Sequence, residues 1–371
     1  GHAGPSSAPV LLAVLIATAL ALLLPLVDPR WRMPMATVLS LAGIGWFDPK
    51  LLVAIGLAVA ATHLAMHLIE ASEGRLRLFL TVLSLSGIVA VFVWHKTGEG
   101  GGVLPSQTGL VWIGFSYLAL KLVAALVDTH RRAHPPVPVR DLLSWSVFLP
   151  TYPSGPVEPL EHFRSQSLQP TWARSLAGLE RVLFGLVKTL LVARALGEWS
   201  SPILSEAGAH TPFALLIAAY AFTLRFYLDF AGYSDIAIGA AALWGIEIQE
   251  NFDRPLIQRN LVQLWQRWHM TLTGWLRRYL FVPISRRLLR WDLSTRNSPA
   301  IVAQLTTMLA CGLWHGITPG FALWGLAQGL GLVFVGVYAR PLGEWVPAGW
   351  RRWWRTSRAA HGLSVGLTFN F

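Results

Sequence analysis

The chain has 371 residues, of which 54% are hydrophobic and only 13% charged, and its formal net charge is +11. Soluble domains usually carry charge on about a quarter of their residues. A soluble globule could not bury this much apolar surface, so the composition predicts an integral membrane protein. The positive charge alone would fit a nucleic-acid binder, but the basic residues fall in short connectors between apolar stretches, which is typical of cytoplasmic loops.

The first apolar stretch, Ala8–Val27, is uncharged and long enough to cross a hydrocarbon core about 30 Å thick. A cleaved signal peptide is the alternative, but no Lys or Arg precedes it and no small-x-small cleavage site follows. Further apolar stretches lie at Pro34–Phe47, Leu51–Ile69, Leu78–Trp94, Val103–Val127, Ser175–Val192, Pro212–Phe230, Ile236–Ile248, Pro299–Leu313 and Phe321–Val337. Some are too short to span alone, so the pattern predicts an all-α, polytopic transmembrane bundle of about 9–11 helices, some broken, re-entrant or in the membrane plane.

Basic connectors alternate with connectors poor in positive charge, and this alternation predicts the orientation of the chain. We expect the connectors that contain Arg75, Arg131 and Arg287 on the cytoplasmic side, with the N-terminus outside. Cys311 is the only cysteine, so the chain can form no intramolecular disulfide and no cysteine metal cluster, and we predict no metal site.

No linker rich in Ser, Gly or charge divides the chain, so we expect a single membrane domain over residues 1–371. Residues 1–127 form plain spans, whereas polar and aromatic residues crowd into a motif-bearing core over residues 142–338. The final residues, LSVGLTFNF, look like the start of another span, and we expect the C-terminus to be cut short.

Three segments rich in Pro, Gly or polar residues predict irregular backbone at membrane depth: Ser146–Pro156, Phe230–Asp235 and Ile317–Gly320. Such backbone is tolerated only where it is buried in protein or lines a cavity. We therefore expect each segment to border a cavity and not to face lipid.

The segment Leu261–Ile284 is predicted to be one helix that places cationic groups in an apolar, aromatic background. Cations cost several kcal/mol in hydrocarbon, so this helix must lie in the interface or face a wet cavity. An amphipathic surface helix accounts for the arginines equally well. It explains His269 less well, because Trp268 and Met270 flank it.

His315 stands in Leu-Trp-His-Gly near the end of an apolar stretch. The pKa of a free imidazole is near 6.5, and an apolar site disfavours the charged form, so the ring should be neutral at pH 7 and able to accept a proton from a hydroxyl. By spacing alone, a helix-packing histidine bonded to a backbone carbonyl is an equal alternative.

Trp314 and Phe321 are expected to supply an apolar wall around His315, and Arg267 or Arg277, if folded over the cavity, would also disfavour a charged ring. Because no carboxylate lies near on the same helix face, we expect activity to fall only below about pH 6.

Several familiar catalytic motifs are missing from the sequence: a Gly-rich phosphate loop, an HExxH zinc helix and a GxSxG nucleophile elbow. Their absence disfavours a serine hydrolase and a nucleotide-driven pump.

Three motifs in order, Phe226–Leu256, Leu264–Tyr279 and Gly312–Gly325, resemble the bacterial membrane-bound O-acyltransferase family, with looser similarity back to Gly114. Relatives of the alginate-acetylation type usually have Asp where this chain has Arg278. They also have a Gly-Gly-Asn-Arg loop where this chain reads SRRLLR. These departures weaken assignment to that subgroup and leave both histidine motifs intact.

The resemblance implies a helical bundle with a central tunnel that moves an acyl group from a thioester to a hydroxyl. It gives His315 the role of general base and His269 that of an auxiliary group. The residues predicted to bind substrate are Trp268, Arg267, Trp314, Asn251, Tyr233 and Asp235. We also expect the two imidazoles to approach a common cavity, within about 15 Å of each other.

The function predicted from this resemblance is transfer of an acetyl or other short acyl group in the bacterial inner membrane, by a multi-pass protein. The donor is a cytoplasmic thioester, acetyl-CoA or an acyl-carrier protein, with no bound cofactor. The acceptor is an extracytoplasmic polysaccharide or a partner acyltransferase, and the lipid bilayer is the remaining partner. One alternative is D-alanyl transfer from a carrier protein to a cell-envelope polymer. Another is a non-catalytic transporter or channel with proton-relay histidines.

Overall fold

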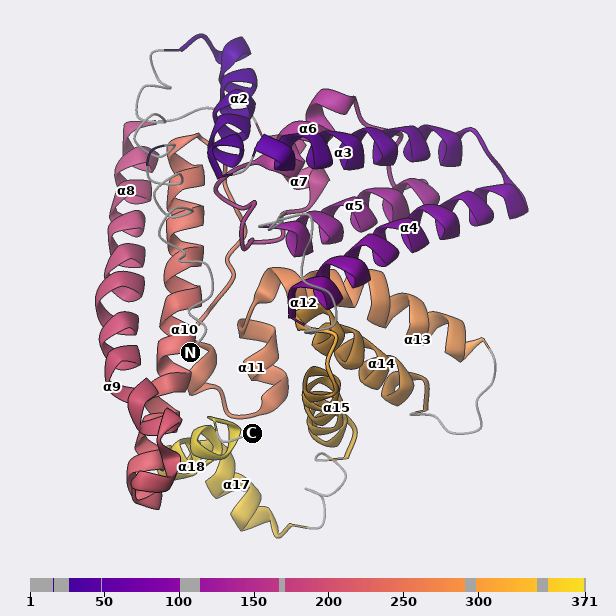
Figure 1. Ribbon diagram of the computed structural model, residues 1–371. Coiled ribbons are helices and arrows are strands. Elements are labelled where there is room, and N and C mark those ends of the chain that lie inside the picture. Colours follow the sequence, from indigo (N-terminus) through magenta and orange to yellow (C-terminus); the bar gives the residue numbers. More distant parts are fainter. Residues whose placement is uncertain are drawn as a thin grey trace. The chain divides into compact units, whose positions relative to one another are not determined.

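A computed structural model describes residue 16 and residues 27–47, 49–100, 114–166, 171–290, 298–338 and 346–369. Within these residues the secondary structure is helical, without strands, which confirms the predicted all-α class (Figure 1). The same residues include four helices that are long and apolar enough to cross a membrane, at Pro49–Glu70, Gly74–Thr97, Pro212–Leu243 and Pro319–Val337. The predicted span Ala8–Val27 falls almost wholly outside the described residues, and the total of 9–11 helices and the tunnel stay predictions.

The chain forms two compact units: residues 1–88 with 108–249, and residues 89–107 with 250–371. The first unit contains α2 (Pro29–Phe47), α3 (Pro49–Glu70), the start of α4 (Gly74–Gly100), α5 (Phe115–His130), α6 (Val139–Val147), α7 (Leu160–Ser165), α8 (Trp172–Leu186), η2 (Val187–Ala193), α9 (Arg194–Ser205), η3 (Ala207–Ala209) and α10 (Pro212–Leu243). The second contains the end of α4, η4 (Pro255–Ile257), α11 (Leu261–Arg267), α12 (Met270–Leu276), η5 (Arg277–Phe281), α13 (Val282–Leu289), α14 (Ser298–His315), α15 (Pro319–Val333), η6 (Phe334–Tyr338), α17 (Ala348–Thr356) and α18 (Arg358–Phe369). The division falls inside the predicted motif-bearing core, and the single-domain interpretation stays a prediction.

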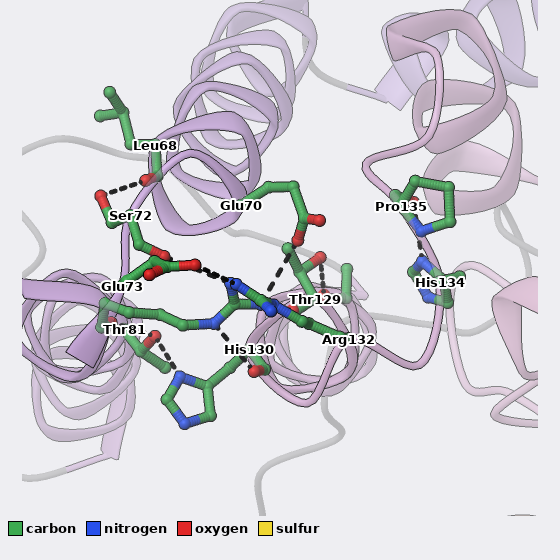
Figure 2. A network of polar contacts seen from close by, with 12 residues as sticks. Leu68, Glu70, Ser72, Glu73, Thr81, Thr129, His130, Arg132, His134 and Pro135 are labelled. Carbon is green, nitrogen blue, oxygen red and sulfur yellow. Dashed lines mark hydrogen bonds and ion pairs between the residues drawn. The ribbon is translucent and has the colours of Figure 1, made fainter.

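A buried arginine joins three helix ends in the first unit. The Arg77 guanidinium, at the start of α4, pairs with Glu70 at 3.3 Å and donates to the carbonyl oxygen of His130 at 3.0 Å. Figure 2 shows this network around Glu70, Thr129 and His130, with Arg132 beside Glu73. The α3–α4 turn and the end of α5 therefore lie together. This agrees with the expectation that the connectors of Arg75 and Arg131 share one side; which side that is stays a prediction.

The first irregular segment, Ser146–Pro156, is enclosed by protein. Most of its side chains are buried, and Lys121 on α5 donates to the carbonyl oxygen of Trp145 at 2.7 Å. The hydroxyl of Tyr233 on α10 donates to the carbonyl oxygen of Pro150 at 3.3 Å. Irregular backbone is thus sheltered as expected at membrane depth, whereas the cavity expected beside it stays a prediction.

The second segment, Phe230–Asp235, is not irregular, and that prediction was wrong. It lies inside the continuous helix α10, which also joins the two apolar stretches predicted on either side of it. α8 and α10 run side by side (Figure 1). A Cβ added to Gly185 on α8 would come within 2.6 Å of the carbonyl oxygen of Gly232. The glycine at 232 therefore serves close helix packing and does not break the helix.

Local signals explain where α10 begins and ends. The Thr211 hydroxyl accepts from the backbone N–H of Ala214, which caps the first turn. At the other end, Gly245 takes a left-handed φ of 77° and donates to the carbonyl oxygen of Ala242 at 3.0 Å. Ile246 donates to the carbonyl oxygen of Ala241 at 2.9 Å, which completes a Schellman cap.

Candidate active site

In the second unit, the helix predicted over Leu261–Ile284 is broken at Trp268 and His269, so the single-helix prediction was wrong. His269 has φ 43° and ψ 52°, in the left-handed region that costs a residue with a side chain about 1–2 kcal/mol. Backbone hydrogen bonds to the preceding segment, Asn251–Asp253, stabilise this break between α11 and α12. Met270 N–H donates to the carbonyl oxygen of Asn251 at 2.9 Å, and Asp253 N–H donates to that of Arg267 at 3.0 Å.

Asn251 fixes the tautomer of His269. Both side chains are buried, Asn251 completely. The amide oxygen Oδ1 of Asn251 lies 3.4 Å from the backbone N–H of Thr271, which can only donate, so this atom is the acceptor. The same oxygen lies 3.1 Å from Nδ1 of His269, so Nδ1 carries the proton. Nε2 is then the nitrogen with the lone pair, and it is the nitrogen able to accept a proton.

His315 is the last residue of α14. The predicted break at Ile317–Gly320 is confirmed for Ile317 and Thr318, which lie in the turn before α15, whereas Pro319 and Gly320 already belong to α15. The cavity expected beside this segment stays a prediction. α14 and α15 approach each other so closely that neither Gly312 nor Gly325 has room for a side chain. A Cβ on Gly312 would collide with the carbonyl oxygen of Phe321, and one on Gly325 with that of Met308. These two glycines bring the first turns of α15 against the end of α14.

An aromatic wall surrounds the His315 ring. The ring centroid lies 4.8 Å from that of Trp314, 6.2 Å from Phe321 and 5.5 Å from Trp324. Trp314 and Phe321 were expected from the sequence. Trp324 was missed, although it follows Phe321 by three positions on one helix face. Among the described residues the polar contact of His315 is with Lys96 and not with a carboxylate.

The Trp314 ring contacts the rings of both predicted histidines. The Trp314 centroid is 6.5 Å from that of His269 and 4.8 Å from that of His315. The imidazoles can be no further apart than the sum of these distances, which is inside the expected limit. Their roles and the common cavity stay predictions.

Among the described residues, Lys96 near the end of α4 places a cation beside His315. Its Nζ lies 3.5 Å from the carbonyl oxygen of His315. From the sequence, we expected Arg267 or Arg277 to be the cation near His315. Arg267 instead forms a half-exposed ion pair with Asp253. Lys96 stands 219 positions from His315, so no local pattern could have found it.

The remaining predicted substrate-binding residues have protein partners. Trp268 packs edge-on against Phe252, with centroids 5.1 Å apart. Tyr233 and Asp235 belong to the first unit, on α10. Asp235 accepts from Arg181 at 3.0 Å and from Lys188 at 2.6 Å, so it joins α10 to α8 and η2. These contacts leave the binding role of all three untested.

The chain belongs to the membrane-bound O-acyltransferase family, whose model matches residues 76–352. This range includes both histidines, Lys96 and the aromatic wall.

Curated relatives carry several acyl-transfer names. The chain is 31% identical to a teichoic acid D-alanyltransferase of Streptococcus thermophilus, over 63% of this chain and 59% of the relative. It is 30% identical to a probable alginate O-acetylase of Pseudomonas syringae, over 62% and 45%. A peptidoglycan O-acetyltransferase of Helicobacter pylori is 25% identical, over 59% and 46%. The chain thus spans about half the length of the curated relatives it matches.

Proposed function

We propose that this protein transfers an acetyl or other short acyl group from a thioester to a hydroxyl, with His315 as general base. The observation that carries the proposal is the cluster of His315, Trp314 and His269 in a chain of this family. Aromatic rings surround the proton acceptor His315, and one of them, Trp314, also contacts the second imidazole. Such surroundings suit proton transfer at a water-poor site.

The proposed reaction has two steps, and one proton moves in each of them. The acceptor oxygen attacks the thioester carbonyl carbon while its proton passes to the lone-pair nitrogen of His315. The carbonyl oxygen becomes an oxyanion. When the C–O double bond reforms, the C–S bond breaks, and the departing sulfur takes the proton back from His315. His269, with its lone pair on Nε2, orients the acceptor hydroxyl or the thiol.

The thioester is acetyl-CoA or an acyl-carrier protein on the cytoplasmic side of a bacterial inner membrane. The acceptor is an extracytoplasmic polysaccharide or a partner acyltransferase that passes the group on. The names of the alginate and peptidoglycan relatives support acetyl transfer to a polysaccharide.

Thiol release from acetyl-CoA by the purified full chain tests this proposal. We expect release from the wild type and none above background from His315→Ala. Equal rates in the two proteins would support the transporter or channel alternative, in which the histidines relay protons without acyl chemistry.

D-alanyl transfer is the second candidate, because a teichoic acid D-alanyltransferase is 31% identical to this chain. A D-alanyl thioester of a carrier protein, offered in place of acetyl-CoA, separates the two candidates. Faster turnover of the D-alanyl thioester than of acetyl-CoA would favour this one.

A further inference from the structure

We infer that Lys96 is a third group of the active site, whose ammonium stabilises the oxyanion formed in the acyl transfer. The inference rests on the proposed function and deepens it. It starts from one contact: Lys96 Nζ lies 3.5 Å from the backbone carbonyl oxygen of His315, the residue assigned as general base.

A helix-capping role is the simpler explanation of this contact. His315 ends α14, and the last four carbonyl groups of a helix lack partners within the helix. A lysine there satisfies a carbonyl and favours the negative end of the helix dipole. Capping explains a hydrogen-bond donor at this position. It does not require a charge, since a neutral donor serves the same carbonyl.

Two observations and one consequence of the proposed step favour a charge at this place. Lys96 is half-buried, and its ammonium lies 5.8 Å from the centroid of the Phe92 ring. The wall of His315 is also aromatic, formed by Trp314, Phe321 and Trp324. In such surroundings a cation acts on nearby negative charge much more strongly than in water. In the proposed step His269 and His315 start as neutral acceptors, so neither supplies positive charge at its start.

The reaction develops negative charge close to this ammonium. The attacked carbonyl carbon must lie one bond from the hydroxyl oxygen whose proton His315 takes, at about 3 Å from a ring nitrogen. The oxyanion is the carbonyl oxygen bonded to that carbon. A lysine within contact of the His315 backbone has a flexible stem that can bring Nζ to this oxygen. The π-electron pair of the carbonyl moves to oxygen beside Lys96 and returns when the C–S bond breaks, and Lys96 keeps its protons throughout.

Three substitutions separate charge from capping. Lys96→Arg keeps the cation, Lys96→Gln keeps a donor for the carbonyl of His315 but no charge, and Lys96→Met removes both. The measurement is kcat and KM for thiol release from acetyl-CoA by the purified full chain, with folding checked by the melting temperature. The matched control is Lys50→Gln, an exposed lysine at the start of α3, which should leave both constants unchanged.

Removal of one oxyanion-stabilising group typically lowers kcat by about 10²–10³-fold. We expect Lys96→Gln and Lys96→Met to lose at least about tenfold in kcat with little change in KM, and Lys96→Arg to retain most activity. Wild-type kcat in Lys96→Gln, with a lower melting temperature only in Lys96→Met, would show a cap and overturn the inference. A rise in KM alone would show donor binding and overturn it too. A wild-type chain without thiol release overturns the proposed acetyl transfer and this role with it.

Discussion

The amide oxygen Oδ1 of Asn251 and the ring nitrogen Nδ1 of His269 are 3.1 Å apart, and both side chains are buried. Replacement of Asn251 by Leu removes the acceptor and leaves Nδ1–H and the Thr271 hydroxyl without this partner. A buried donor left unpaired costs about 1–3 kcal/mol. We expect Asn251→Leu to lower the free energy of unfolding and to lower kcat by at least about tenfold, a part of the 10²–10⁴ that positioned proton transfer contributes.

Thr271→Val is the matched control for Asn251. It removes a donor to the same oxygen, from Thr271 Oγ1 at 2.9 Å, but leaves the His269 bond in place. It should lose stability and keep most activity. Equal kcat values for Thr271→Val and Asn251→Leu would show that Asn251 does not act through His269.

The close approach of α14 and α15 predicts a steric effect at Gly312. A methyl group there meets the backbone of Phe321, which cannot turn away as a side chain could. Overpacking of this kind costs about 1–3 kcal/mol. Gly312→Ala should therefore lower the melting temperature and also reduce activity, because His315 and Phe321 separate. Gly336→Ala, with no atom within 4 Å of the added Cβ, should do neither.

Arg77 joins the ends of α3, α4 and α5, and its loss should destabilise the first unit. Hydrogen bonds to a charged group contribute about 1.5–3 kcal/mol. Arg77→Met should lower the free energy of unfolding in detergent by that amount, since the carbonyl groups of Thr129 and His130 lose their donor. The exposed neighbour Arg75→Met should change it by no more than about 0.5 kcal/mol. Equal changes in the free energy of unfolding for Arg77→Met and Arg75→Met would mean that the Arg77 network does not stabilise the protein.

Topology can be tested by cysteine labelling, because Cys311 is the only native cysteine and is buried. In a Cys311→Ala background, single cysteines at positions 75, 131 and 287 should resist a membrane-impermeant maleimide in intact cells and react after the membrane is opened. Positions 75 and 131 should behave alike, because the ends of α3 and α5 meet at Arg77. Reaction at any of the three in intact cells contradicts the orientation.

The sequence predicted a helix or a helix break correctly where a local pattern alone determines it. Apolar length predicted α3, and Thr318-Pro319 after His315 predicted the break before α15. The prediction failed at Phe230–Asp235, where Gly232 suggested a break. A glycine in a membrane helix can serve either a bend or a close approach, and the partner helix that decides between them is not visible locally.

The contacts of the site were predicted where the residues are close in sequence and were not predicted where they are distant. His315, Trp314 and Phe321 are neighbours in sequence, so their contact followed from the pattern around the break. The left-handed backbone of His269 depends on Asn251, and the cation beside His315 comes from α4. Such contacts between distant segments carry no local signal. The predicted role of Asn251 in substrate binding stays a prediction, and its complete burial against His269 was not foreseen.

The proposed role of His315 as general base is tested by the rate of thiol release from acetyl-CoA by His315→Gln, measured beside the wild type in the same detergent. Gln keeps a polar side chain of similar size but cannot accept and return a proton. We expect a variant with the wild-type melting temperature and a rate lowered by about 10²-fold or more. A correctly folded His315→Gln with a near wild-type rate would contradict it and make His315 a structural residue.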